Sequence, residues 1–208
     1  MSTMKDAREI KRREVIVTGF GGQGIVLAGK ILGMAAALGD HLESTLVQSY
    51  GPESRGGACC AQVVISEAII QYPYIKAPDI LICMSQSAFL KYRQSVRPGG
   101  TLLTDKDLVS LEDTPIPGVD AFAIPSTRMA EELGRKMMAN IIMMGFATAV
   151  TGVVSAEAMK SAVTASVPRG TEELNLGAFA RGFDYGLSTL KGREKKRSGA
   201  RGERGVAL

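Results

Sequence analysis

The sequence predicts an α/β fold with a mostly parallel, Rossmann-like sheet, an antiparallel excursion, flanking helices and a helical C-terminal part. Two observations support this prediction. Apolar runs typical of buried parallel strands, such as residues 79–84, alternate with helical patterns as far as residue 134. From residue 140 onward, the apolar spacing is helical throughout. In folds of this class, ligands bind at the carboxyl ends of the strands.

The first predicted strand, which begins at residue 15, leads into a glycine-rich turn and a helix at residues 23–38. The turn reads Gly19-Phe-Gly-Gly-Gln-Gly24. Glycine accepts positive φ angles and lets a ligand approach the backbone closely, and the N-terminus of the following helix favours an anion. We therefore expect an anionic ligand at the backbone N–H groups of Gly21, Gly22, Gln23 and Gly24.

The spacing Gly19-x-Gly21-x-x-Gly24 also matches the dinucleotide fingerprint, which needs an acidic residue about 20 residues further on, at the end of the second strand. The second predicted strand, residues 42–49, ends in Gln48-Ser49-Tyr50, whereas Asp40 and Glu43 lie at its start. Three interpretations remain open: a loop for an anion other than NAD, a tight structural turn, and an NAD or FAD site.

A turn-rich loop at residues 49–57 separates the second strand from two further predicted strands at 59–66 and 69–72. Their direct succession predicts an antiparallel excursion. Strands are also expected at 79–84 and 101–105, with a helix beginning at residues 85–87. A short strand at 121–124 ends at Pro125, and Ser126 is placed to cap a helix that continues to residue 134.

The C-terminal third is predicted to be helical. Residues 137–154 are apolar but are interrupted by polar residues and glycines, which favours a buried helix over a membrane span. Ser155 is a suitable N-cap for a helix at 156–166, and Asn175 for a final helix at 176–190.

A chain of 208 residues with 45% hydrophobic content can bury one substantial core, so residues 14–190 are predicted to form a single domain. The net charge of +4 comes from the two ends. Residues 1–13 hold five basic and two acidic residues, residues 191–208 hold seven basic and two acidic residues, and the intervening domain is mildly acidic. We expect a basic N-terminal arm, a disordered basic C-terminal tail and no nucleic-acid partner, while docking of the tail on an acidic partner remains open.

Few side chains in this chain could carry catalysis or bind a metal. Cys59, Cys60 and Cys83 include no Cys-x-x-Cys pair and cannot supply the four thiolates of an iron–sulfur cluster. His41 is the single histidine, which excludes a histidine-based acid–base pair. We therefore expect no catalytic residue and no metal site here. The charged residues 1–13 lack the apolar core of a signal peptide, so a soluble, cytoplasmic protein without a membrane span is expected.

An ordered set of motifs resembles the gamma subunit of 2-oxoacid:ferredoxin oxidoreductases over residues 14–190. The motifs are Gly19-Phe-Gly-Gly-Gln-Gly-Ile25, Ser49-Tyr-Gly-Pro-Glu-Ser-Arg-Gly-Gly57, Pro78-Asp-Ile-Leu81, Ala123-Ile-Pro-Ser126 and the Met-rich helix at 140–151. Members of this family oxidatively decarboxylate a 2-oxo acid with coenzyme A and pass electrons to ferredoxin. The resemblance implies alpha, beta and delta-type partner subunits, which carry thiamine diphosphate, magnesium and iron–sulfur clusters.

The resemblance also implies that this chain holds coenzyme A at the mouth of the active site. The phosphates of coenzyme A suit a glycine loop together with a guanidinium. We expect Arg55 to bond these phosphates, with a salt bridge or a subunit contact as the alternative. Tyr50 either stacks on the adenine or closes its loop against the core. A separate chain without a fused ferredoxin-like part favours 2-oxoglutarate as the substrate. A stand-alone NAD- or flavin-dependent oxidoreductase and a structural subunit without a ligand remain alternatives.

Overall fold

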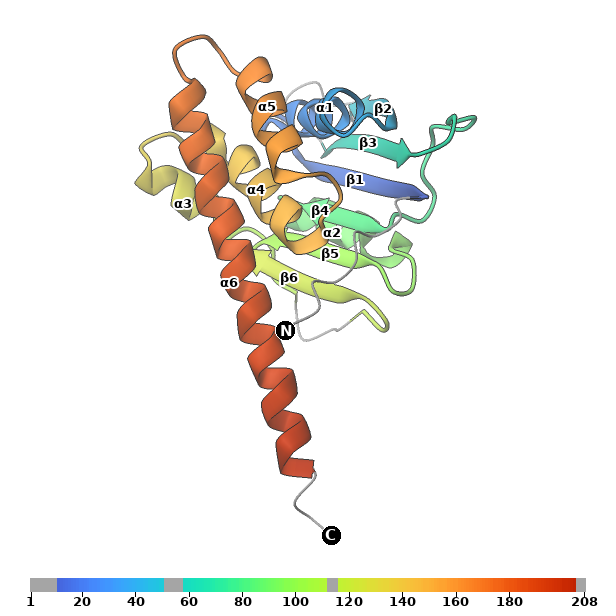
Figure 1. Ribbon diagram of the computed structural model, residues 1–208, viewed down its shortest axis with the longest axis vertical. Coiled ribbons are helices and arrows are strands. Elements are labelled where there is room, and N and C mark those ends of the chain that lie inside the picture. The colour runs from blue at the N-terminus through green and yellow to red at the C-terminus, as the bar shows by residue number, and fades with distance from the viewer. Residues whose placement is uncertain (1–10, 51–57, 112–115, 205–208) are drawn as a thin grey trace.

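The computed structural model describes residues 11–50, 58–111 and 116–204, which form one sheet with helices on both faces (Figure 1). The strands are β1 (Arg12–Phe20), β2 (Glu43–Tyr50), β3 (Ala58–Ser66), β4 (Ile80–Cys83), β5 (Thr101–Asp105) and β6 (Asp120–Ile124). The α-helices are α1 (Ile25–Met34), α2 (Gln86–Tyr92), α3 (Ser126–Glu132), α4 (Ala139–Thr151), α5 (Ala156–Ser166) and α6 (Glu172–Arg204). A π-helical turn, η1 (Ala35–Gly39), and two 3₁₀ turns, η2 (Arg93–Ser95) and η3 (Lys136–Met138), complete the elements.

The sheet has the order β2-β3-β1-β4-β5-β6. The strands β1, β4, β5 and β6 are parallel, whereas β3 runs antiparallel to both β1 and β2. The predicted mostly parallel sheet with an antiparallel excursion is therefore confirmed. The predicted strand at 69–72 is wrong. Because β1 and β2 occupy both edges of β3, no edge of β3 remains for residues 69–72 to pair with, and the side chain of Ile69 is 82% exposed.

The two faces of the sheet are covered unequally. Helices α1, α3, α4, α5 and α6 pack on one face, where alternate strand residues such as Val15, Val17 and Val63 join the larger core. The other face packs Ile16, Val64 and neighbouring residues against α2 and the loops around it. This alternation follows from the period of two along a strand, because successive side chains point to opposite faces.

Helix α4 lies at the centre of the larger core, and residues 139–148 of it are all buried. It runs parallel to α6 at very close range, because glycines on both helices remove the side chains between them. A Cβ atom added to Gly145 or Gly182 would lie within 2.2 Å of a backbone oxygen of the other helix. The predicted buried helix is confirmed. Within the described part of the chain, no helix is long and apolar enough to cross a membrane.

Of the three predicted helix caps, one is confirmed and two are wrong. The hydroxyl of Ser155 accepts from the Ala158 N–H, as predicted. The hydroxyl of Ser85, where only the start of a helix was predicted, also caps its helix by accepting from the Ala88 N–H. Ser126 makes no cap, because its hydroxyl donates instead to the buried carboxylate of Asp105 at 2.5 Å. Helix α6 begins at Glu172, so Asn175 lies inside its first turn and donates to the Thr171 carbonyl.

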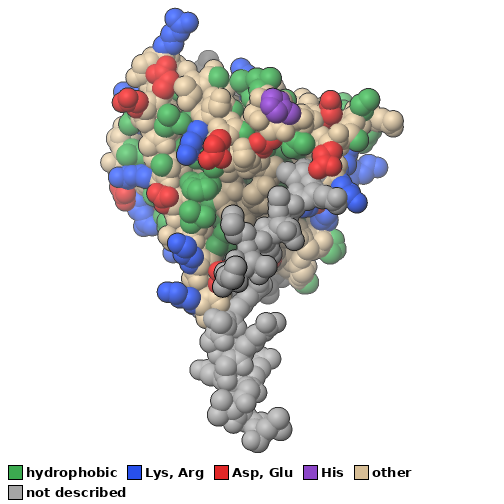
Figure 2. Space-filling view, in the orientation of Figure 1, with side chains coloured by type: hydrophobic (Ala, Val, Ile, Leu, Met, Phe, Trp, Pro, Cys, Tyr) green, Lys and Arg blue, Asp and Glu red, His purple; other side chains and the backbone are tan. Residues whose placement is uncertain are grey.

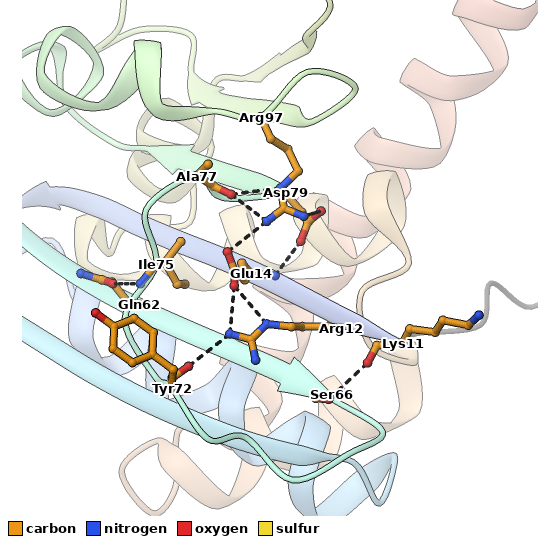
Figure 3. A network of polar contacts seen from close by, with 10 residues as sticks. All are labelled: Lys11, Arg12, Glu14, Gln62, Ser66, Tyr72, Ile75, Ala77, Asp79 and Arg97. Atoms are coloured by element: carbon orange, nitrogen blue, oxygen red, sulfur yellow. Dashed lines mark hydrogen bonds and ion pairs between the residues drawn. The ribbon is translucent and has the colours of Figure 1, made fainter.

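Polar contacts tie the amino ends of the central strands together (Figure 3). The Arg97 guanidinium lies 3.0 Å from carboxylate oxygens of both Glu14 and Asp79, and it also donates to the Ala77 carbonyl. Glu14 further accepts from Arg12 at 2.9 Å. This network holds the start of β1 against the segments that precede β4 and β5.

Helix α6 continues to Arg204 and extends beyond the sheet (Figure 1), so the boundary predicted at residue 190 does not coincide with the end of the helix. Arg193 of this helix covers the edge strand β6. Its guanidinium donates to the Ala121 carbonyl at 2.6 Å and lies 3.9 Å from the centre of the Phe122 ring.

Candidate functional site

The glycine loop, residues 19–24, forms the turn between β1 and α1, as the sequence predicts. Gly22 and Gly24 have φ angles of 98° and 72°, which are unfavourable for a residue with a side chain. Gly21 and Gly22 are exposed. Among the described residues, the N–H groups of Gly21, Gly22 and Gly24 make no hydrogen bond, whereas the Gln23 N–H donates to the Phe20 carbonyl. The loop therefore presents three free donors at the N-terminus of α1.

The side chain of Gln23 holds this loop in shape. Its carbonyl oxygen accepts from the Phe20 N–H at 2.7 Å, and its amide nitrogen donates to the Met84 carbonyl at 2.8 Å. A Cβ atom on Gly19 would overlap that carbonyl oxygen, which explains the glycine there. Gln23 thus joins the end of β1 to the end of β4. The backbone N–H of Gln23 already donates to the Phe20 carbonyl and is not available to a ligand. Gln23 is therefore expected to position the loop rather than to contact the ligand.

A second amide holds the loop from the other side. Asn140, near the start of α4, is 2% exposed and donates from Nδ2 to the Gly24 carbonyl at 3.2 Å. A Cβ atom on Gly24 would lie 2.2 Å from that same nitrogen. Sequence reasoning gave Asn140 no role at the loop. A polar residue at the start of an otherwise apolar helix was the available signal, but its partner lies 116 residues away.

The loop lies at the switch point of the sheet, because the chain leaves β1 toward β2 on one side and β4 lies on the other. The exposed side chain of Phe20 flanks it. In a dinucleotide-binding fold, the second strand lies next to the first, so that its terminal acid reaches the ribose. Here β3 lies between them, which places β2 about 10 Å from β1. Together with the missing acid, this arrangement disfavours NAD.

The remaining predicted ligand residues stay predictions. Tyr50 ends β2, where its backbone pairs with Cys59 of β3. Arg55 lies outside the described residues. Of the predicted ligand residues that the structure describes, it brings the backbone donors Gly21, Gly22 and Gly24 together.

The three thiols are buried and remain protonated at neutral pH. Burial raises the pKa of Cys59, Cys60 and Cys83, and it also raises the pKa of Tyr92 to about 12. Cys60 and Cys83 lie on either side of Thr18 in neighbouring strands. In the described ranges, no group of three or more His, Cys, Asp or Glu residues could hold a metal ion.

On the face of the molecule shown in Figure 2, charge is mixed rather than concentrated. Figure 2 shows basic and acidic side chains interspersed over one face, with apolar side chains in small groups. At the glycine loop, the free N–H groups and the dipole of α1 favour an anion. Such a site can hold a phosphate or another anion but supplies no nucleophile or general base.

Comparisons with known proteins show which family and fold this chain resembles. The family model described as pyruvate ferredoxin/flavodoxin oxidoreductase matches residues 14–185. The chain is 50% identical over 182 residues to the 2-oxoglutarate synthase subunit KorC of Methanocaldococcus jannaschii, which covers 87% of this chain and 97% of the relative.

Two solved structures share the fold. A keto/oxoacid ferredoxin oxidoreductase gamma subunit from Geobacter sulfurreducens is 39% identical, covers 85% of this chain and 99% of its own, and superposes with a TM-score of 0.75. A 2-oxoglutarate:ferredoxin oxidoreductase from Magnetococcus marinus, solved with 2-oxoglutarate, coenzyme A and succinyl-CoA, is 23% identical. It covers 86% of this chain and 31% of its own, with a TM-score of 0.77.

Proposed function

Because the chain belongs to the pyruvate ferredoxin/flavodoxin oxidoreductase family, as a gamma subunit of a 2-oxoacid:ferredoxin oxidoreductase, we propose that its complex acts on 2-oxoglutarate and that its glycine loop holds coenzyme A. The reaction converts 2-oxoglutarate and coenzyme A to succinyl-CoA and carbon dioxide and reduces ferredoxin. The identity of 50% to a 2-oxoglutarate synthase subunit supports this substrate.

The observation that carries the coenzyme A proposal is the open space above Gly22. A Cβ atom on Gly22 would meet no atom of the described residues within 4 Å, so the exposed loop leaves room for a ligand against its backbone. The free N–H groups of Gly21, Gly22 and Gly24 point to an anionic ligand, and coenzyme A carries a pyrophosphate. Gln23 and Asn140 hold these donors in place before the ligand arrives.

We assign the chemical steps to partner subunits of the alpha, beta and delta types. Thiamine diphosphate, magnesium and iron–sulfur clusters on those subunits would supply decarboxylation and electron transfer. The residues of this chain would bind the phosphates and orient the thiol of coenzyme A toward the reacting carbon, which makes acyl transfer effectively intramolecular. Such a complex would work in the cytoplasm, where ferredoxin collects the electrons.

A pair of glycine variants tests this proposal in the assembled complex. Gly22→Val fills the space above the loop, whereas Gly99→Val also adds a side chain at positive φ in open space, but in the turn before β5. We expect Gly22→Val to raise the KM for coenzyme A at least about fivefold, equivalent to about 1 kcal/mol, with the KM for 2-oxoglutarate unchanged. Gly99→Val should change neither value. Equal KM values for coenzyme A in both variants would contradict the proposed contact between the loop and coenzyme A.

Arg55→Ala tests the predicted guanidinium contact in the same assay and should also raise the KM for coenzyme A. The alternatives give different results. A stand-alone oxidoreductase would bind NADH or retain a flavin as the isolated subunit. A structural subunit without a ligand would leave the KM for coenzyme A unchanged in every loop variant.

A further inference from the structure

A second surface feature lies close to the glycine loop. A groove of about 310 Å³ opens between the first turns of α1, α4 and α6. Leu27, Ile141, Val167 and Leu174 contribute its apolar wall. We call it the Met137 groove, after the methionine at its rim. It reaches the loop through Asn140, which lines the groove and donates to the Gly24 carbonyl.

Met137 is one of the most exposed large apolar residues in the described part of the chain. Its side chain is 82% exposed, although it lies in the 3₁₀ turn η3 directly before two buried residues, Met138 and Ala139. Leu174, on the opposite wall, is 36% exposed. Exposed apolar side chains that border an apolar groove are typical of protein interfaces, where methionine and arginine are enriched.

The charge at the rim indicates what the groove accepts. Arg135 and Lys136 precede Met137. Lys136 pairs with Glu131 at 2.9 Å, whereas the side chain of Arg135 makes no hydrogen bond or ion pair within the described part of the chain. An occupant with a carboxylate would satisfy this guanidinium. A second copy of this chain fits less well, because a twofold contact would bring the basic rim against itself.

From these observations we propose that the Met137 groove docks a segment of another subunit of the same oxidoreductase. The segment inserts an aliphatic side chain between Leu27 and Leu174 and places a carboxylate on Arg135. The inference rests on the subunit role of the chain and not on the coenzyme A contact. Docking here would also hold α4, and through Asn140 the glycine loop, against the subunit that carries the chemistry.

The test uses the complex assembled from all subunits. Met137→Asp puts a charge at the rim, and Ile69→Asp is its matched control, because Ile69 is also 82% exposed but follows β3, beyond the amino end of β1. Arg135→Glu is compared with Arg128→Glu, an exposed arginine on α3. The measured quantities are the affinity of the subunit for the rest of the complex, by native mass spectrometry and titration, and the melting temperature of the isolated subunit.

We expect Met137→Asp and Arg135→Glu to weaken assembly at least about tenfold and the two controls to change it less than about twofold, with unchanged melting temperatures. Three results would overturn the inference. The first is that Met137→Asp and Arg135→Glu leave assembly unaffected. The second is that they change only the KM for coenzyme A, which would indicate a small-molecule pocket, and the third is that they abolish self-association of the isolated subunit, which would indicate a contact between two copies of this chain. Failure of the coenzyme A proposal is separate, because it is read from Gly22→Val in complexes that assemble normally.

Discussion

The Nδ2 atom of Asn140 donates to the carbonyl oxygen of Gly24 across 3.2 Å, which joins the buried helix α4 to the glycine loop. The same carbonyl accepts from the Ala28 N–H in the first turn of α1. Because Asn140 is 2% exposed, water cannot replace its amide without opening the core. The position of the loop therefore depends on a helix that follows it by more than a hundred residues.

Removing this bond should loosen the loop. We predict that Asn140→Asp, which keeps the shape but replaces the donor with a carboxylate oxygen, raises the KM for coenzyme A about fivefold or more and lowers stability by about 1–3 kcal/mol. Gln62→Ala is the control, since it removes a side-chain amide that accepts from the Ile75 N–H, far from the loop. The control should lower the melting temperature without changing the KM. Similar KM values for both variants would contradict the positioning role.

The glycines between α4 and α6 give a prediction about stability. Gly182→Ala would place its Cβ almost onto the Ile142 carbonyl, and we expect a loss of about 2 kcal/mol or more in the free energy of unfolding. Gly177→Ala and Gly192→Ala lie in the same helix and meet no atom within 4 Å. These two should gain about 0.5–1 kcal/mol from helix propensity. Urea unfolding of the four proteins measures the differences, and a neutral Gly182→Ala would refute the close packing.

The network around Arg97 should contribute more than an ordinary surface ion pair. Arg97→Met removes bonds to Glu14, Asp79 and the Ala77 carbonyl, and it leaves two carboxylates that are only 14% and 12% exposed. We expect a loss of about 2 kcal/mol, measured by thermal unfolding. Arg128→Met loses one contact of 3.7 Å at a side chain 58% exposed, and it should cost about 0.5 kcal/mol or less. Equal losses of stability in Arg97→Met and Arg128→Met would mean that the network contributes no more than an ordinary surface ion pair.

The buried thiols predict how stability depends on pH. Burial raises the pKa of Cys83 above the ordinary value of 9.0, so the folded protein keeps a proton that the unfolded chain releases. The contribution of this thiol to the free energy of unfolding is thus fully present below pH 9.0 and is lost as the pH rises above it. Urea unfolding at pH 7.5, 9.5 and 10.5 should show this decline, with a shallower slope in Cys83→Ala. Iodoacetamide should label Cys59, Cys60 and Cys83 only after unfolding, because all three are buried.

Much of the fold followed from local patterns. The run at 79–84 and the glycine turn each predict an element without knowledge of distant contacts, and both elements are present. The cap Ser155 was predictable for the same reason, since a cap bonds within its own first turn. Ser126 was not, because the competing acceptor Asp105 belongs to another strand. The strand predicted at 69–72 failed because pairing depends on a free sheet edge, which no local pattern reveals.

By itself, the sequence determined the α/β class, the glycine turn between β1 and α1 and the family, because these depend on residue order and on backbone freedom at glycine. The tertiary structure alone decided that β3 separates β2 from β1, that Gln23 and Asn140 fix the loop, and that Met137 borders a groove. Each of these is a contact between residues distant in the chain. Such contacts arise from how whole elements pack, and packing is a property of the assembled core.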